Sequence, residues 1–212
     1  MKVRVRPPKR RKTPDKSEKG ENHSKHKPNL EEDFHHHCGY CGAYDGFGYT
    51  RTYFEIDHFV PKDFLKKTNS DIGFCKYDNL VYSCRFCNNS KSDLWPSEDD
   101  KIHHKNNEGF VDPCIDDFDN HLYRTSDGAI LWKTDLGKWM ATQAFKFDER
   151  QEEIKVLWNY NQIRIQILDL VDLLNKEIEG SKEYIIIYEK LIPLNFKHFN
   201  FQKQLAEFYS NE

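Results

Sequence analysis

The sequence predicts an α+β fold, in which a core stapled by a four-cysteine zinc site is joined to a β-hairpin and a C-terminal helical region. Three observations predict it. Four of the six cysteines form two C-x-x-C pairs, and the sulfurs of such pairs can converge on one zinc ion. Residues 129–147 read as two strands around an Asp-Leu-Gly turn. Apolar residues then recur at helical spacing beyond residue 148.

Composition divides the 212 residues into four parts. Residues 1–28 hold 11 Lys or Arg and 3 Asp or Glu, a net charge of +8, whereas the rest hold 21 basic and 32 acidic residues, a net charge of −11. Because the first part has few large apolar side chains, we expect a disordered basic tail that attracts nucleic acid or solubilises the chain. Residues 29–96 are predicted to form the zinc-stapled core, residues 97–147 an acidic loop with the hairpin, and residues 148–212 the helical region.

The helical region is predicted to hold more than one helix. Asp148 and Gln151 have the spacing of a capping box, which starts a helix, and Gly180 is placed to end it. A second helix over about 182–191 is predicted to stop before Pro193, with a short third helix near 201–209.

The cysteine pairs Cys38/Cys41 and Cys84/Cys87 are separated by 42 residues. This spacer is longer than the roughly 15–20 residues of a simple zinc ribbon, so the zinc would join the two ends of an inserted element. Four thiolates leave zinc no open position, which predicts a structural rather than a catalytic ion. The alternative is four reduced cysteines in an ordinary core.

The chain is expected to reside in a reducing, cytoplasmic setting. No apolar run approaches the roughly 20 residues that a membrane-spanning helix needs. The N-terminal residues are charged where a secretion signal would be apolar. Zinc-binding thiolates, rather than disulfides, are typical of such a setting.

Between the cysteine pairs lie residue types that suit phosphodiester hydrolysis. His58 has a side chain whose usual pKa is near neutrality, as a general base requires. A carboxylate from Asp57 and an amide oxygen from Asn88 are ligands that suit Mg²⁺. Adjacent strand residues point to opposite faces, so Asp57 and His58 can serve one site only at a strand end, which Pro61 favours.

Together these pieces resemble the HNH endonuclease family, and in particular its members with two zinc knuckles around a ββα-metal fold. The resemblance covers about residues 34–96. The elements that carry it stand in the family's order: Cys38-Gly39-Tyr40-Cys41, Asp57-His58 with Pro61, Asn79-Leu80, and Cys84-Arg85-Phe86-Cys87-Asn88 with Lys91.

The resemblance implies a role for each of five residues. His58 would activate the attacking water, Asp57 and Asn88 would bind a single catalytic Mg²⁺ or Mn²⁺, Asn79 would orient His58, and Lys91 would contact a phosphate. The implied activity is hydrolysis of phosphodiester bonds, with DNA favoured as the substrate. The alternatives are cleavage of structured RNA such as tRNA by the same site, and a non-catalytic, zinc-stabilised module that binds nucleic acid or protein.

Beyond Trp95, the stretch Phe110-Val111-Asp112-Pro113-Cys114 with Asp119-Asn120-His121 is similar to the continuation seen in some bacterial HNH proteins of mobile-element and phage-defence neighbourhoods. This similarity implies an antiviral role and a targeting or sensing protein partner, such as an ATPase. The acidic stretch 97–120 and the apolar C-terminal helices are the predicted docking surfaces for such a partner.

Overall fold

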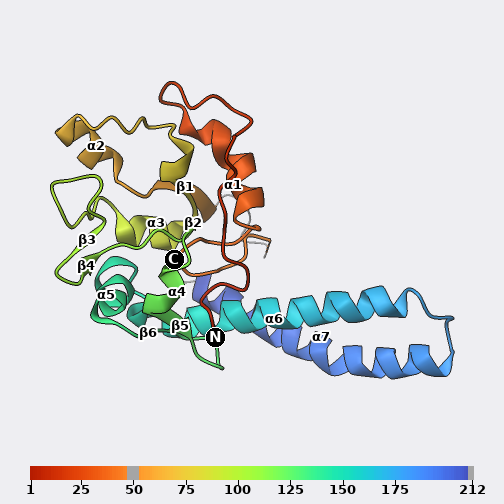
Figure 1. The fold of residues 1–212 in the computed structure, drawn as a ribbon. Helices are drawn as coiled ribbons and strands as arrows, with labels where there is room; N and C mark the ends of the chain where they lie inside the picture. The colour runs from red at the N-terminus through yellow and green to blue at the C-terminus, as the bar shows by residue number, and fades with distance from the viewer. Residues whose placement is uncertain (47–52, 210–212) are drawn as a thin grey trace. The chain divides into compact units, whose positions relative to one another are not determined.

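The computed structural model describes residues 1–46 and 53–209, which divide into two units, Met1–Gln151 and Glu152–Glu212 (Figure 1). Residues 47–52 of the predicted core and 210–212 of the predicted helical region lie outside the described residues. The described part mixes helices with short antiparallel hairpins, which confirms the predicted α+β class. None of its helices is both long enough and apolar enough to cross a membrane.

The centre of the first unit is an antiparallel hairpin followed directly by a helix. Strand β1 (Phe54–His58) pairs with β2 (Leu80–Cys84), with Asp57 opposite Val81 and His58 opposite Leu80. Every residue of β2 is buried, so its apolar Leu-Val-Tyr sequence has protein on both faces. Helix α3 (Arg85–Lys91) begins at the residue after β2. These three elements form a ββα unit.

The connection from β1 to β2 folds back on the end of β1. It holds α2 (Lys62–Thr68), which starts after the extended Pro61, and the 3-10 turn η3 (Tyr77–Asn79). Pro61 stands directly before the first turn of α2 with φ −60° and ψ 143°, and it lacks the amide hydrogen that a longer strand would need. This connection brings the Phe74 carbonyl to the His58 ring and the Asn79 carbonyl to the Phe59 amide.

The N-terminal segment lies along the first unit, which differs from the disordered tail predicted for residues 1–28. Val3 is fully buried and Arg4 is only 2 % exposed. The Arg4 guanidinium pairs with Asp119 at 3.1 Å and also donates to the Pro113 carbonyl. The segment ends in the 3-10 turn η1 (His23–His26) and helix α1 (Lys27–Asp33).

Ion pairs explain why the segment is held. Arg10 binds Asp112 at 2.8 Å and donates to the Leu80 carbonyl of β2, while Arg11 pairs with Asp33 at 2.9 Å. The positive segment and the acidic body neutralise each other. Composition alone predicts disorder because the segment has few large apolar side chains. The buried Arg4 and Arg10 nevertheless hold it in place through charged hydrogen bonds to Asp119 and Asp112.

Two further hairpins lie in the first unit, and one corrects the predicted hairpin over 129–147. Strand β6 (Ile130–Trp132) pairs with β5 (Leu122–Arg124), which precedes it, rather than with residues 139–147. The other hairpin joins β3 (His104–Lys105) to β4 (Glu108–Gly109). A short helix precedes β5, namely α4 (Phe118–His121).

Residues after β6 are helical because they bury a helical stripe. Helix α5 (Asp135–Trp139) continues into the π-helix η4 (Met140–Ala144). The Thr134 hydroxyl accepts a bond from the Gly137 amide and caps the start. Leu136, Met140 and Ala144 recur every four residues and are buried, so the predicted Asp-Leu-Gly turn is the first turn of a helix.

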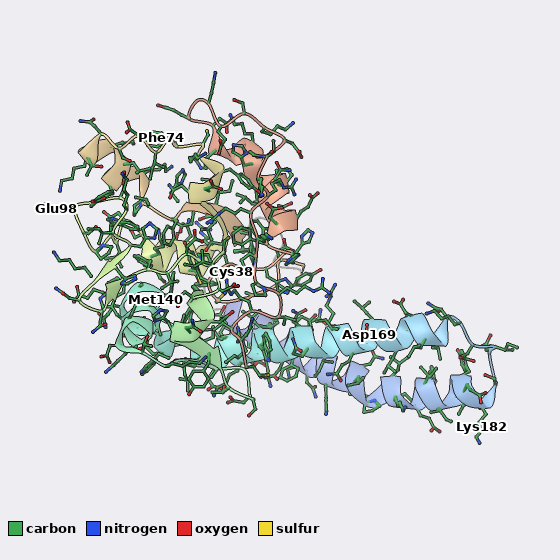
Figure 2. The ribbon with its side chains drawn as sticks, in the orientation of Figure 1. Cys38, Phe74, Glu98, Met140, Asp169 and Lys182 are labelled. Atoms are coloured by element: carbon green, nitrogen blue, oxygen red, sulfur yellow. The ribbon has the colours of Figure 1, made fainter. Side chains whose placement is uncertain are left out.

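The second unit is a pair of long helices. After the 3-10 turn η5 (Asp148–Arg150), α6 (Gln151–Leu174) leads through a short connection to α7 (Lys182–Tyr209). The two helices run antiparallel (Figure 1). The Tyr160 and His198 rings pack with their centroids 4.3 Å apart. Figure 2 labels Asp169 on α6 and Lys182 at the start of α7. Pro193 lies inside α7, so the predicted helix stop there is wrong.

A single proline does not end α7 because its cost is local. Proline removes one backbone hydrogen bond and crowds the preceding turn. The helix spans 28 residues and continues on both sides of Pro193, so one lost bond is a small part of the whole. Gly180, the predicted helix end, lies in the connection with φ +80°, a conformation that glycine adopts without strain.

Candidate functional site

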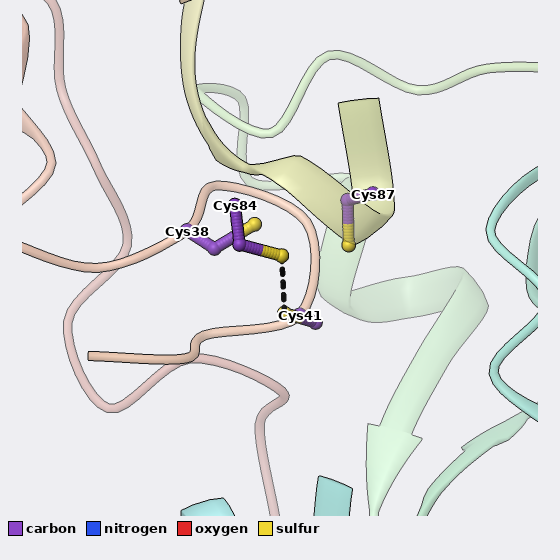
Figure 3. A group of neighbouring side chains, drawn as sticks. All are labelled: Cys38, Cys41, Cys84 and Cys87. Carbon is purple, nitrogen blue, oxygen red and sulfur yellow. Dashed lines mark hydrogen bonds between the residues drawn. The ribbon is translucent and has the colours of Figure 1, made fainter. Parts of the chain in front are cut away.

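The four cysteines of the two C-x-x-C pairs gather at one point (Figure 3). All four are buried, and their sulfurs lie within 4.8 Å of one another, with Cys41 Sγ and Cys84 Sγ 3.7 Å apart. Zinc–sulfur bonds of about 2.3 Å in a tetrahedron put neighbouring sulfurs about 3.8 Å apart. The donor set and its size therefore fit one structural Zn²⁺.

Local backbone structure positions each cysteine pair. In the first pair, the Gly42 amide donates to the Cys38 carbonyl and the Gly39 amide to Tyr82 of β2. A Cβ on Gly39 would lie 2.7 Å from the Phe34 ring, so only glycine fits this turn. The second pair spans the junction of β2 and α3. A zinc ion here would fix the ββα unit to the first knuckle.

His58 lies at the end of β1 and is 4 % exposed. Its Nε2 is 2.8 Å from the Phe74 carbonyl oxygen. Because a carbonyl only accepts hydrogen bonds, Nε2 carries the proton and Nδ1 keeps a free lone pair. Burial lowers the pKa of His58 to about 4. The side chain is therefore a neutral imidazole at neutral pH, with Nδ1 as its basic atom.

Part of the cover over His58 comes from the N-terminal segment. The His23 ring of η1 packs edge-on against the His58 ring, with centroids 4.7 Å apart. Burial also lowers the pKa of His23. The Glu18 carboxylate accepts a hydrogen bond of 2.7 Å from the Tyr77 amide, which holds this part of the segment in place.

Asp57 is 4 % exposed, and both of its oxygens have partners. The Tyr40 hydroxyl donates to Oδ2 at 2.5 Å, and Lys91 Nζ lies 3.1 Å from the carboxylate. Burial raises the pKa of Asp57, and the Lys91 charge opposes that shift. Burial and the nearby Asp57 charge raise the pKa of Tyr40, so the phenol remains a donor.

Lys91 does not lie where a phosphate could reach it. Its side chain is fully buried, and Nζ donates to Asp57 and, at 2.8 Å, to the His58 carbonyl. The ammonium also lies 5.5 Å from the centre of the Phe110 ring. The geometry differs from the predicted phosphate contact and makes Lys91 the counter-charge that neutralises buried Asp57.

Asn88 of α3 is held by Glu55 of β1. Its Nδ2 donates to Glu55 Oε2 at 2.6 Å, and Arg85 lies 3.8 Å from the other Glu55 oxygen. With the amide nitrogen engaged, the amide oxygen Oδ1 is left for another partner. A carboxylate and an amide oxygen are hard donors of the kind that Mg²⁺ and Mn²⁺ prefer.

A cavity of about 250 Å³ brings the candidate catalytic residues together. Asp57, His58 and Asn88 all line it. The remaining lining residues are mostly polar: Ile56, Pro61, Lys62, Asp63, Ser92 and Asp93. The donor set of Asp57 and Asn88 thus fits a hydrated divalent cation, with the His58 imidazole beside it.

Asn79 is buried and closes the loop that follows His58. Its Oδ1 accepts from the Val60 amide at 2.8 Å, and its Nδ2 donates to the Val60 carbonyl at 3.1 Å. The Phe59 amide donates to the Asn79 carbonyl at 2.8 Å. Asn79 therefore fixes the backbone of the two residues directly after His58.

Four contributors to the site were not predicted from the sequence. Tyr40 supports Asp57, Glu55 orients Asn88, the Phe74 carbonyl fixes the His58 tautomer, and His23 packs on His58. Glu55 could have been found, because it lies two residues before Asp57 and shares its strand face. The Phe74 carbonyl has no sequence signal, since any residue provides one.

Comparison with known proteins gives one family. The HNH endonuclease family model matches residues 38–94, from the first residue of the four-cysteine cluster to just beyond α3. The match covers 57 of the 212 residues and includes the whole ββα unit. Neither the search of curated proteins nor that of solved structures gave a match.

Proposed function

We propose, from the premise that residues 38–94 form an HNH endonuclease domain, that this protein is a metal-dependent nuclease that hydrolyses phosphodiester bonds in DNA. The observation that carries the proposal is the cavity shared by Asp57, His58 and Asn88. It combines a neutral imidazole with two hard oxygen donors, which is the set that water activation and a bound divalent cation require.

Asp57 and Asn88 would hold the cation, Mg²⁺ or Mn²⁺. When bound, the cation would supply positive charge that stabilises the phosphate and the leaving oxygen as negative charge develops there. The chain supplies the rest of the arrangement. Lys91 and Tyr40 hold the Asp57 carboxylate, and Glu55 holds the Asn88 amide with its oxygen free. Zinc on the four cysteines would have a purely structural task.

His58 supplies the base. Water attacks phosphorus, its proton passes to His58 Nδ1, and the bond from phosphorus to the 3′ oxygen breaks. The leaving 3′ oxygen takes a proton from the solvent. The products are a 3′-hydroxyl and a 5′-phosphate. The Phe74 carbonyl favours this transfer because it accepts the Nε2 hydrogen and stabilises the imidazolium that forms. The low pKa of His58 keeps the base unprotonated at neutral pH.

DNA is the proposed substrate because the resemblance to HNH endonucleases favours it; the chemistry itself takes its nucleophile from water and would act on DNA and RNA alike. The test is incubation of the protein with plasmid DNA and with total tRNA, in Mg²⁺, Mn²⁺ or chelator. We expect metal-dependent cleavage of the plasmid and intact tRNA. Cleavage of tRNA alone would show that the substrate is RNA rather than DNA and would leave the proposed hydrolysis reaction unchanged. Cleavage of neither would favour a non-catalytic binding module.

Replacement of the base separates catalysis from folding. We expect His58→Ala to slow cleavage at least about 100-fold, because a positioned general base contributes that much or more. Zinc content and circular dichroism should not change, because His58 is not among the four clustered ligands. The control is His104→Ala, an exposed histidine on β3. Cleavage by H58A at the rate of the unsubstituted chain would refute the assignment.

The biological setting is a further part of the proposal. We infer a cytoplasmic effector of antiviral defence, directed by a targeting or sensing partner such as an ATPase. Its support is the resemblance of the sequence to small defence nucleases. The measurement is phage plating on bacteria that carry the gene, alone or with its neighbouring genes, against the H58A variant. Equal plaque counts in all strains would contradict a defence role.

A further inference from the structure

Helix α7 carries a stripe of exposed apolar side chains that the nuclease site does not use. Its members are Ile185, Tyr188, Ile192, Phe196 and Phe199, which are 44–68 % exposed. Successive residues of an α-helix are separated by about 100°, so these five positions fall within an arc of about 80°. They form one continuous face, hereafter the α7 stripe.

The α7 stripe is separate from the face that packs on α6. Leu191, His198 and Leu205 recur every seven residues on the packing side; both leucines are buried, and His198 contacts Tyr160 of α6 at 4.3 Å. The helical spacing puts the centre of the α7 stripe about 120° from the centre of this packing face. Within the second unit, one apolar face of α7 is therefore covered by α6, and a second one, the α7 stripe, is exposed to solvent.

The area of the α7 stripe matches what a stable dimer needs. At about 200 Å² for each large side chain, the exposed fractions amount to about 550 Å² of apolar surface per copy. A standard interface buries about 800 Å² per partner, and about 65 % of a homodimer interface is apolar, which is about 520 Å². No additional apolar surface is required.

The spacing of the α7 stripe is symmetric about Ile192. Ile185 and Phe199 lie seven residues before and after it, and Tyr188 and Phe196 lie four residues before and after it. Two antiparallel copies of such a helix present the same face to each other, as a two-fold interface requires. Such a spacing gives two antiparallel copies the same contacts on either side of the axis.

We propose that the α7 stripe is a homodimer interface, in which two copies of α7 pair antiparallel about a two-fold axis at Ile192. Ile192 then meets its own copy, Ile185 meets Phe199, and Tyr188 meets Phe196. The position that mirrors Glu189 in the sequence about the axis is the uncharged Asn195, three residues after Ile192. The pairing therefore opposes no like charges beside the apolar centre.

The first test is the mass of the full chain in solution, measured by light scattering at protein concentrations from about 1 µM upward. The monomer has a mass of 25.4 kDa, and we expect twice that value. A mass that stays at one chain across the range would overturn the proposal, whether or not the α7 stripe then binds a different protein.

A matched pair of variants tests where the copies meet. Ile192→Glu puts two carboxylates at the axis, and we expect it to raise the dimer Kd at least about 100-fold, because buried unpaired charge is costly. Ile186→Glu is the control, since Ile186 is 43 % exposed against 44 % for Ile192 and lies about 100° from Ile185 around the same helix. Circular dichroism checks that both variants fold. Equal dimer Kd values for I192E and I186E would refute the interface.

Cysteine crosslinking tests the register. We expect Ile192→Cys to form a disulfide-linked dimer on mild oxidation, because the two Cβ atoms meet at the axis. Ile185→Cys should crosslink to a Phe199→Cys chain and not to itself. The unsubstituted protein shows the background from its own cysteines. Self-crosslinking of I185C with none for I192C would exclude the proposed axis. Cleavage is not measured in any of these tests, so their result is independent of the proposed nuclease activity.

Discussion

Replacing Lys91 by Met tests whether this residue serves the fold or the substrate. The Lys91 ammonium is fully buried and bonded to the Asp57 carboxylate and the His58 carbonyl. Methionine keeps much of the side-chain volume but removes the charge and both hydrogen bonds. If Lys91 bound phosphate instead, as its motif position implies, the substitution would weaken nucleic-acid binding and leave the stability of the protein unchanged.

The expected loss of stability follows from these contacts. Each hydrogen bond to a charged group contributes about 1.5–3 kcal/mol, and breaking a buried ion pair from one side costs about 3–5 kcal/mol. We therefore expect K91M to lower the free energy of unfolding by about 3–5 kcal/mol at pH 7. Domains of this size have only about 5–15 kcal/mol to lose.

The loss should shrink at acidic pH. Burial already raises the pKa of Asp57 in the folded state, and Lys91 opposes that shift. Without Lys91, the pKa of Asp57 rises further, so folded K91M binds a proton that the unfolded chain has released. Its free energy of unfolding should recover by up to about 1.4 kcal/mol for each pH unit lowered from pH 7.

Urea unfolding, followed by circular dichroism at pH 7 and pH 5, measures both effects. Lys62→Met is the control, because Lys62 lines the same cavity but is exposed, and we expect a change within about 0.5 kcal/mol. Adding Asp57→Asn to K91M should restore part of the stability, since the unpaired carboxylate is gone. If K91M and K62M unfold at the same urea concentration, the buried pair does not contribute as described.

Three more perturbations test the site. Cys84→Ser should remove the bound zinc and unfold the ββα unit. Metal analysis and circular dichroism measure both effects, with Cys114→Ser as the control. A C84S variant that is folded but contains no zinc would contradict a structural zinc. Cleavage should hold nearly constant down to about pH 5 and fall as the solution becomes more acidic than the His58 pKa of about 4, because protonation removes the base; a pH profile of kcat/KM that bends near the usual histidine value of about 6.5 would contradict it. Glu55→Ala should raise the Mg²⁺ concentration for half-maximal cleavage about 10–100-fold by releasing the Asn88 amide, and an unchanged Mg²⁺ requirement would argue against that orienting role.

The core of the fold could be predicted from short sequence motifs, because the structures that these motifs form depend on residues close together in the sequence. Two residues between cysteines define a knuckle wherever it occurs, and the helix that starts at Cys84 carries Asn88 and Lys91 on neighbouring turns. Which of these two side chains reaches the cavity was not predictable. That depends on Tyr40, Asp57 and Phe110, whose packing around Lys91 is a tertiary property.

Structure that depends on contacts between distant parts of the sequence could not be predicted in this way. The basic N-terminal segment looks disordered on composition, since the carboxylates of Asp112 and Asp119 that hold it lie more than a hundred residues away. Residues 139–147 alternate apolar and polar side chains at their end, which resembles a strand. The Thr134 cap was the available signal that a helix begins there instead.

The buried N-terminal segment has a consequence for how the chain folds during synthesis. Val3 and Arg4 find their partner Asp119 across more than a hundred residues of sequence, and the Met1 amino group donates to the Arg124 carbonyl. Contacts of such high contact order form slowly. During synthesis, Val3 and Arg4 therefore stay without these partners until residues 119–124, more than a hundred positions later, have left the ribosome.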